Sequence, residues 1–194
     1  MKITDVQACV IGRPEPHSGG CVWTFVRIYT DEGLVGTGEC NSAGTFTSGF
    51  ATKQAILHMK RLLVGKDPMN IGPIYEFLRR MGRYGGTTGA PLIFALTGID
   101  NALYDIAGKA LGVPVYKLLG GRFREKIRLY ADCHAGETNE PQAYAEKALE
   151  VIEEGYSAVK FDVDHSGVGK LDRFNWTAGA KEMTHIVNLI QATR

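Results

Sequence analysis

The sequence predicts an α+β region over residues 1–125, followed by the first units of a parallel α/β array over residues 126–194. Three observations predict this fold class. Segments rich in β-forming residues and separated by turns fill the first 40 residues, three helical patterns follow, and strand and helix patterns alternate after Gly121. With 194 residues, the chain is long enough to bury a hydrophobic core without disulfides.

The first region begins with a predicted antiparallel sheet. Its three strands are expected over residues 3–11, 23–29 and 34–39. Polar and apolar residues alternate in the first strand, the second is rich in β-branched and aromatic residues, and Asp31-Glu32-Gly33 provides a turn before the third. Gly36 and Gly38 interrupt the third strand, which indicates that another stretch of backbone comes close there.

Three helices are expected after the sheet. They run from Ser48 to the residue before Gly65, over 70–81 and over 91–111. Ser48 is a residue type that caps helix N-termini, and glycine residues follow the first and third helical patterns. The third helix is apolar on almost every side, which predicts a central, buried position.

The second region alternates strand and helix. Strands are expected over 126–131 and 158–163, and helices from Asn139 to Gly155 and over about 178–193. Pro141 falls in the first turn of the first of these helices, where a missing N–H costs nothing. This order and spacing favour parallel strands joined through helices.

Composition excludes several classes of function. The formal net charge is +1, so nothing favours nucleic acid or an anionic membrane as a partner. No apolar run is long enough to span a bilayer, and the N-terminal segment lacks a signal-peptide pattern, so we expect a cytoplasmic protein. The four cysteines, Cys9, Cys21, Cys40 and Cys133, have neither zinc-site nor disulfide-framework spacing and are expected to be reduced.

Two adjoining segments carry a family resemblance. They are GIDNALYDIAGKALGVPVY at 98–116 and KLLGGRFR at 117–124, followed by the strand around 127–130. Together they closely resemble the hinge between capping domain and barrel in the mandelate racemase and muconate lactonizing enzyme branch of the enolase superfamily. The strand end Gly36-Thr37-Gly38-Glu39 also resembles that family, and the resemblance covers nearly the whole chain.

The resemblance implies both a fold and a chemistry. Residues 1–125 would form an α+β capping domain, and residues 126–194 the first two β/α units of a (β/α)8-type barrel that is incomplete in this chain. The family removes a proton next to a carboxylate, and Mg²⁺ stabilises the resulting enediolate. The family's metal ligands lie at the ends of the third to fifth barrel strands, so we name no ligand here. The resemblance also implies a homo-oligomer.

Lys160 and Asp162 are the candidate catalytic residues. Side chains alternate along a strand, so these two would point into the barrel while Val159 and Phe161 face the helices. The family often carries Lys-x-Lys here, and Asp162 replaces the second lysine, which acts as a base. We hypothesise that Lys160 binds the substrate carboxylate and that Asp162 orients Lys160 or a substrate hydroxyl. The alternative is a surface ion pair.

Substrate-binding candidates come from strand ends and loops. His134 follows the first barrel strand and would lie at the barrel mouth, unless it is only a solvated loop histidine. In the family, two loops of the capping domain close over the barrel, and the matching stretches here are 13–23 and 41–48. Candidates in these loops are His17, Trp23, Asn41, Thr45 and Phe46.

The resemblance therefore predicts the N-terminal part of a Mg²⁺-dependent enzyme acting on a small carboxylate, most simply an acid-sugar dehydratase with a sugar acid as substrate. A muconate cycloisomerase or a racemase or epimerase of the same family is the second interpretation, and the Lys160-Phe161-Asp162 sequence counts against it. A truncated, non-catalytic domain is the third, and the chain alone is expected to be inactive.

Overall fold

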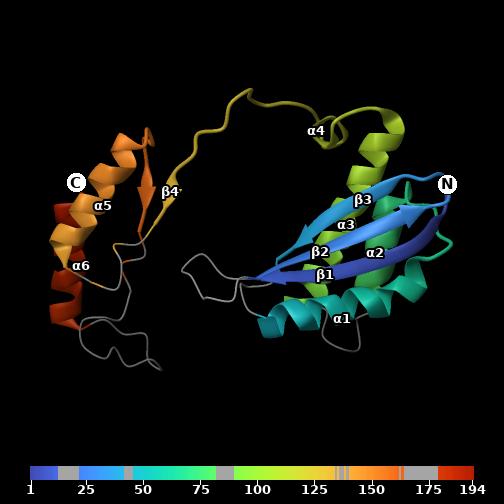
Figure 1. Ribbon diagram of the computed structural model, residues 1–194, viewed down its shortest axis with the longest axis horizontal. Coiled ribbons are helices and arrows are strands. Elements are labelled where there is room, and N and C mark those ends of the chain that lie inside the picture. Colours follow the sequence, from blue (N-terminus) through green and yellow to red (C-terminus); the bar gives the residue numbers. More distant parts are fainter. Residues whose placement is uncertain are drawn as a thin grey trace. The chain divides into compact units, whose positions relative to one another are not determined.

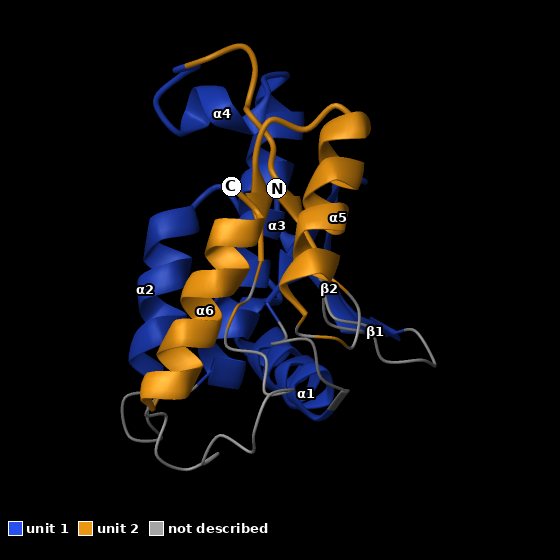
Figure 2. Ribbon diagram, turned by 90° about the vertical axis from the view of Figure 1, so that its left-hand side faces the viewer, with its two compact units in different colours: residues 1–123 blue, residues 124–194 orange. Residues whose placement is uncertain are grey.

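The computed structural model describes residues 1–12, 22–41, 46–81, 90–133, 135, 138, 140–161, 163 and 179–194, without the side chain of Phe46. The chain divides into two compact units, residues 1–123 and 124–194 (Figure 2). The division expected from the sequence, after residue 125, separated a cap from a barrel. That assignment of roles stays a prediction, and the two units are considered separately below.

Unit 1 contains a three-stranded antiparallel sheet in the order β1-β2-β3 (Figure 1). Its strands are β1 (Ile3–Gly12), β2 (Val22–Thr30) and β3 (Val35–Cys40). Gly33, with φ +80°, lies in the turn between β2 and β3, a conformation that glycine adopts without strain. One face of the sheet carries the buried side chains of Val6, Val26 and Ile28. The predicted sheet is thus confirmed.

The described part of unit 1 also contains helices, of which the first and the third cover that buried face. They are α1 (Phe46–Leu63), α2 (Ile71–Met81), α3 (Ala90–Leu111) and the short α4 (Val115–Leu118). α1 contacts β1, α3 contacts β3, and α1 and α3 contact each other. The apolar face of α3 is buried along its length, which confirms the central position expected of it. None of the described helices is long and apolar enough to cross a membrane.

Two details of the helices differ from expectation. α1 begins at Phe46, so Ser48 lies inside the first turn and is not the capping residue. The residue before this helix falls outside the described part of the chain, and the apolar repeat by itself could not locate the first turn. The single turn α4 was not expected, because four residues are too few to show a helical repeat.

Glycines let α3 approach β3 at backbone distance. A Cβ placed on Gly36 would overlap the carbonyl oxygen of Ala102, and one placed on Gly38 would overlap that of Gly98. Gly98 in turn leaves the space that the Cys40 sulfur occupies. The close backbone approach expected from the glycines in this strand is confirmed, and its partner is the central helix.

Polar side chains of α3 also pair with the outer edge of β3. The bonds run from Asn101 Nδ2 to Glu39 O (3.3 Å), from Thr37 N to Asp105 Oδ2 (2.9 Å) and from Lys109 Nζ to Val35 O (2.6 Å). Residues four apart on the helix thus meet backbone groups two apart on the strand, because both steps advance about 6–7 Å. The helix satisfies backbone groups that an edge strand would otherwise leave open.

Cys40 provides a first testable prediction. Its side chain is 1% exposed, and burial raises the pKa of its thiol from about 9 to about 12. Because the thiolate is the reactive form, we expect iodoacetamide at pH 8 to modify the exposed Cys9 and to spare Cys40 until urea unfolds the chain. The raised pKa stabilises the fold fully below pH 9, and this contribution is lost as the pH rises towards 12. Peptide mass spectrometry would measure both sites, and equal labelling in the folded state would contradict the burial.

Unit 2 pairs two short parallel strands and two helices. Its elements are β4 (Ala131–Asp132), α5 (Pro141–Glu153), β5 (Val159–Lys160) and α6 (Ala180–Ala192). Ala131 pairs with Val159 and Asp132 with Lys160, which confirms the parallel pairing expected here. Tyr144 on α5 and Leu189 on α6 are among the buried residues of this unit.

Both strands are shorter than the predicted ranges 126–131 and 158–163. Ile127 and Leu129 show the reason, since their side chains are 75% and 65% exposed and lie outside the ladder. A strand pattern becomes a strand only where a neighbouring backbone supplies hydrogen bonds. In the described part of unit 2, that ladder is limited to the two residue pairs above.

Candidate functional site

Two strand ends of unit 2 bring opposite charges together. Lys160 is the last residue of β5 and Asp132 the last of β4, and the two are directly paired in the parallel register. The Lys160 ammonium lies 3.0 Å from Asp132 Oδ1 and 2.9 Å from Oδ2, so both carboxylate oxygens accept from it. The C-terminal ends of parallel strands are where α/β folds place their active sites.

The contact between Phe161 and α5 indicates the direction in which the Lys160 side chain points. The Phe161 ring contacts the buried Tyr144 of α5 edge to face, with ring centroids 5.1 Å apart. Because neighbouring side chains alternate, Lys160 points to the face opposite α5, as the strand pattern predicts. Asp162, the other candidate catalytic residue, lies outside the described residues.

The ion pair is open to a ligand. The side chains of Lys160 and Asp132 are 45% and 54% exposed. An exposed pair of this kind contributes about 0–1 kcal/mol to stability. The neighbouring Cys133 is a poor nucleophile, since burial raises the pKa of its thiol. The arrangement therefore provides a cation suited to an anionic substrate, and Cys133, its neighbour among the described residues, is not activated as a nucleophile.

Asp132 was missed by the sequence reasoning, which selected His134 two residues further on. Part of the signal was available in the pattern, because Asp132 directly follows the predicted strand 126–131 and Lys160 lies within the predicted strand 158–163. The sequence pattern did not give the register between these two strands. A shift of one residue would have placed Asp132 on the opposite face from Lys160.

Most of the other candidates cannot be placed. His17, Thr45 and His134 fall outside the described residues, as does the side chain of Phe46. Trp23 and Asn41 are both exposed and lie at one end of the sheet of unit 1, since their neighbours Thr24 and Cys40 are paired. They belong to a different unit from Lys160, and a site that joins the two groups stays a prediction.

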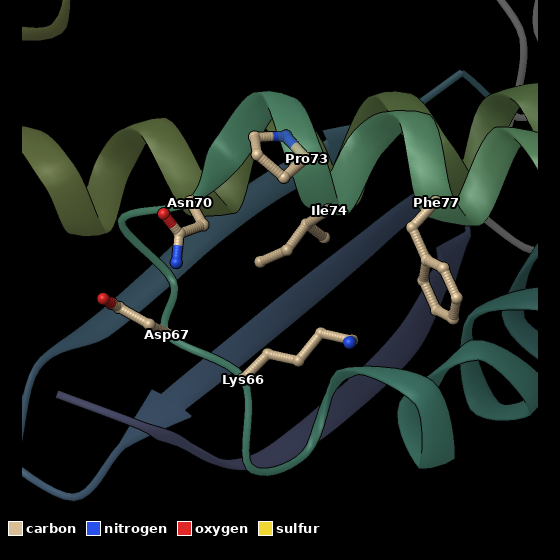
Figure 3. A pocket seen from close by; sticks show the side chains of 6 residues that line it. All are labelled: Lys66, Asp67, Asn70, Pro73, Ile74 and Phe77. Atoms are coloured by element: carbon tan, nitrogen blue, oxygen red, sulfur yellow. The ribbon is translucent and has the colours of Figure 1, made fainter.

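A pocket of about 200 Å³ lies elsewhere in unit 1, where the α1–α2 connection meets α2 (Figure 3). Two of its polar side chains, those of Lys66 and Asp67, interact with nearby groups of the chain. The Lys66 ammonium lies 4.6 Å from the centre of the Phe77 ring, and the Asp67 carboxylate accepts from the backbone N–H of Met69. These contacts organise the start of α2, and we assign the pocket no chemistry.

The fit to a metal can be tested only on part of the chain. Among the side chains that the structure describes, no three of the types His, Cys, Asp and Glu converge as metal ligands would. Asp162, Asp164 and His165 lie outside that part. The described residues do not supply a Mg²⁺ site.

Comparison with known proteins identifies relatives along the whole chain. Residues 19–120 match the N-terminal domain of mandelate racemase / muconate lactonizing enzyme. A D-xylonate dehydratase of Haloferax volcanii is 40% identical over 192 residues, which is 98% of this chain and 44% of that protein. A D-galactonate dehydratase of Verminephrobacter eiseniae is 45% identical over 108 residues, which is 56% of this chain and 27% of that protein.

Comparison with solved structures gives the same result as comparison with the sequences. A mandelate racemase/muconate lactonizing enzyme-like protein from Rubrobacter xylanophilus has a TM-score of 0.84 at 33% identity, covering 100% of this chain and 50% of that one. A member of the enolase superfamily from Salmonella Typhimurium has a TM-score of 0.81 at 34% identity, covering 100% and 51%. The chain thus spans about half the length of these relatives or less. By the match over residues 19–120, it belongs to the mandelate racemase / muconate lactonizing enzyme family of the enolase superfamily.

Proposed function

We propose that the protein carrying this chain is an acid-sugar dehydratase. The observation that carries the proposal is the 40% identity to a D-xylonate dehydratase across almost the entire chain. The strand-end cation Lys160 supports it, because the substrates named for these relatives are carboxylates. The proposal includes a capping domain over residues 1–125, a (β/α)8-type barrel that begins at residue 126, a cytoplasmic location and a homo-oligomeric assembly.

The reaction removes water from a sugar acid. The C–H bond next to the carboxylate breaks and its proton goes to a base. The hydroxyl on the next carbon takes a proton from a general acid and leaves as water. The resulting enol then gains a proton at carbon 3 and loses one from its oxygen to become a 2-oxo acid. The first step is difficult because negative charge accumulates on a group that is already an anion. The Lys160 ammonium would pair with the substrate carboxylate and stabilise that charge from a fixed position.

Other residues would complete the site. Asp162 would orient Lys160 or a substrate hydroxyl, and His134 with the loop residues His17, Trp23, Asn41, Thr45 and Phe46 would contact the rest of the sugar acid. By the family resemblance, the principal base is a histidine from a later barrel strand. Bound Mg²⁺ would supply electrostatic stabilisation of the enediolate.

Isotope exchange separates this proposal from its alternatives. We expect the complete protein, incubated in D₂O with D-xylonate, D-galactonate and related sugar acids, to form a 2-oxo-3-deoxy acid with deuterium at carbon 3, which proton NMR detects. A racemase or epimerase would instead return the intact acid with deuterium at carbon 2. The dehydratase proposal fails if the whole panel yields no 2-oxo acid.

Metal removal gives a further prediction. We expect EDTA to abolish the dehydration and Mg²⁺ added in excess of the chelator to restore it, because the enediolate needs a preorganised divalent cation. A control sample dialysed without chelator should keep its rate. Full activity in the chelated sample, with metal content checked by elemental analysis, would contradict the Mg²⁺ dependence.

A further inference from the structure

We propose that Asp132 is a positioning residue that holds the Lys160 ammonium in place for the substrate carboxylate. The proposal rests on the dehydratase function above, and assigns a role in it to a side chain at the end of the first parallel strand. Asp132 is not expected to contact the reacting carbon. Its effect would be transmitted through Lys160.

Backbone pairing makes Asp132 a rigid partner. Hydrogen bonds flank the Asp132–Lys160 pair, from Ala131 N to Ala158 O at 3.0 Å and from Cys133 N to Lys160 O at 3.1 Å. Both Cα atoms are therefore held by the ladder, and both side chains leave the same face of the two strands. A lysine side chain has four rotatable bonds, and a two-oxygen contact from a neighbouring strand restricts them.

Charge determines how loss of Asp132 should affect the kinetics. The carboxylate keeps the ammonium at the strand end, but it also repels an incoming substrate carboxylate at short range. Removing its charge should therefore leave substrate binding intact or tighter, while the ammonium is less well aligned when charge develops on the substrate. The expected signature is a lower kcat with a KM that is unchanged or reduced.

The stability of the variants distinguishes a positioning role of Asp132 from a purely structural role. Asp132→Asn should leave the melting temperature close to that of the wild type, because asparagine keeps the size of aspartate and an oxygen that can accept from Lys160. The Lys147–Glu150 pair on α5 is a matched control, with a nitrogen–oxygen distance of 2.8 Å and side chains 30% and 57% exposed. Glu150→Gln removes the same charge from the same unit, from helix α5 and without altering the contact between Asp132 and Lys160.

A double-mutant cycle on the complete protein tests the proposal. We expect Asp132→Asn to lower kcat by about 10- to 100-fold, Asp132→Glu to recover part of that loss, and Glu150→Gln to keep the wild-type rate. In a Lys160→Met background, Asp132→Asn should cause no further loss, because the group that it positions is already absent.

Several outcomes would overturn the proposal. A kcat for Asp132→Asn within twofold of wild type would do so, as would an equal fractional loss with and without Lys160. If the wild type dehydrates no sugar acid, the proposed function has failed. If Lys160→Met retains the wild-type rate, the role of Lys160 has failed and the positioning role of Asp132 with it, while the dehydratase function stands. If Lys160→Met is inactive and Asp132→Asn is not impaired, only the positioning role has failed.

Discussion

Replacing Lys160 by methionine should lower kcat/KM for dehydration by about 100- to 1,000-fold, the cost typical of removing one preorganised group that stabilises transition-state charge. Methionine keeps the unbranched stem and removes the ammonium that lies at the end of β5. The loss should appear in kcat as well as KM, because the charge on the substrate carboxylate grows during proton removal.

Steady-state kinetics with the most active sugar acid would measure this loss. Lys147→Met is the matched control, since it removes a lysine of the same unit that pairs with Glu150 on α5. We expect that control to retain the wild-type kcat/KM. If Lys160→Met keeps kcat/KM within twofold of wild type, Lys160 does not interact with the substrate carboxylate in the transition state.

Replacing Gly38 by alanine should destabilise unit 1 by about 3 kcal/mol or more, the upper range for overpacking a core. The new Cβ would overlap the Gly98 carbonyl oxygen and crowd the Ala102 backbone nitrogen, and neither atom can move unless α3 moves. Displacing the helix would also strain the bonds from Asn101, Asp105 and Lys109 to the edge of β3.

Gly72→Ala provides the control for that substitution. Gly72 lies in the first turn of α2, and a Cβ there would meet nothing within 4 Å. Alanine at this site should change the free energy of unfolding by no more than about 1 kcal/mol, because the restricted unfolded chain offsets the steric cost of a Cβ before Pro73. Urea unfolding by circular dichroism would measure both variants, with amide exchange over residues 90–111 as a local probe. Equal stability of the two variants would contradict the close contact between α3 and β3.

Local patterns were sufficient for the three strands and the three long helices of unit 1. Alternation located the strands, the helical repeat located α1 to α3, and the glycines of β3 correctly indicated close backbone approach. These signals work because each depends on residues a few positions apart. The start of α1 and the single turn α4 were missed, since ends of helices depend on contacts that a repeat does not encode.

The candidate site was only partly predictable. Alternation placed Lys160 opposite the helix-facing Phe161, which contacts Tyr144. The partner of Lys160 could not be found in the same way, because Asp132 is 28 residues away and pairs with it only through the register of β4 and β5. Asp162 and His134 stay predictions, since they lie outside the described residues.

By itself, the sequence determined the order of strands and helices, the family and the strand-end position of Lys160, because these depend on local spacing and on motifs that can be read along the chain. The tertiary structure decided which distant residues are in contact. Gly98 and Ala102 lie against β3, and Asp132 pairs with Lys160. Such contacts are set by strand register and helix docking. Strand register and helix docking bring together residues that are distant in sequence, so a local sequence pattern does not reveal these contacts.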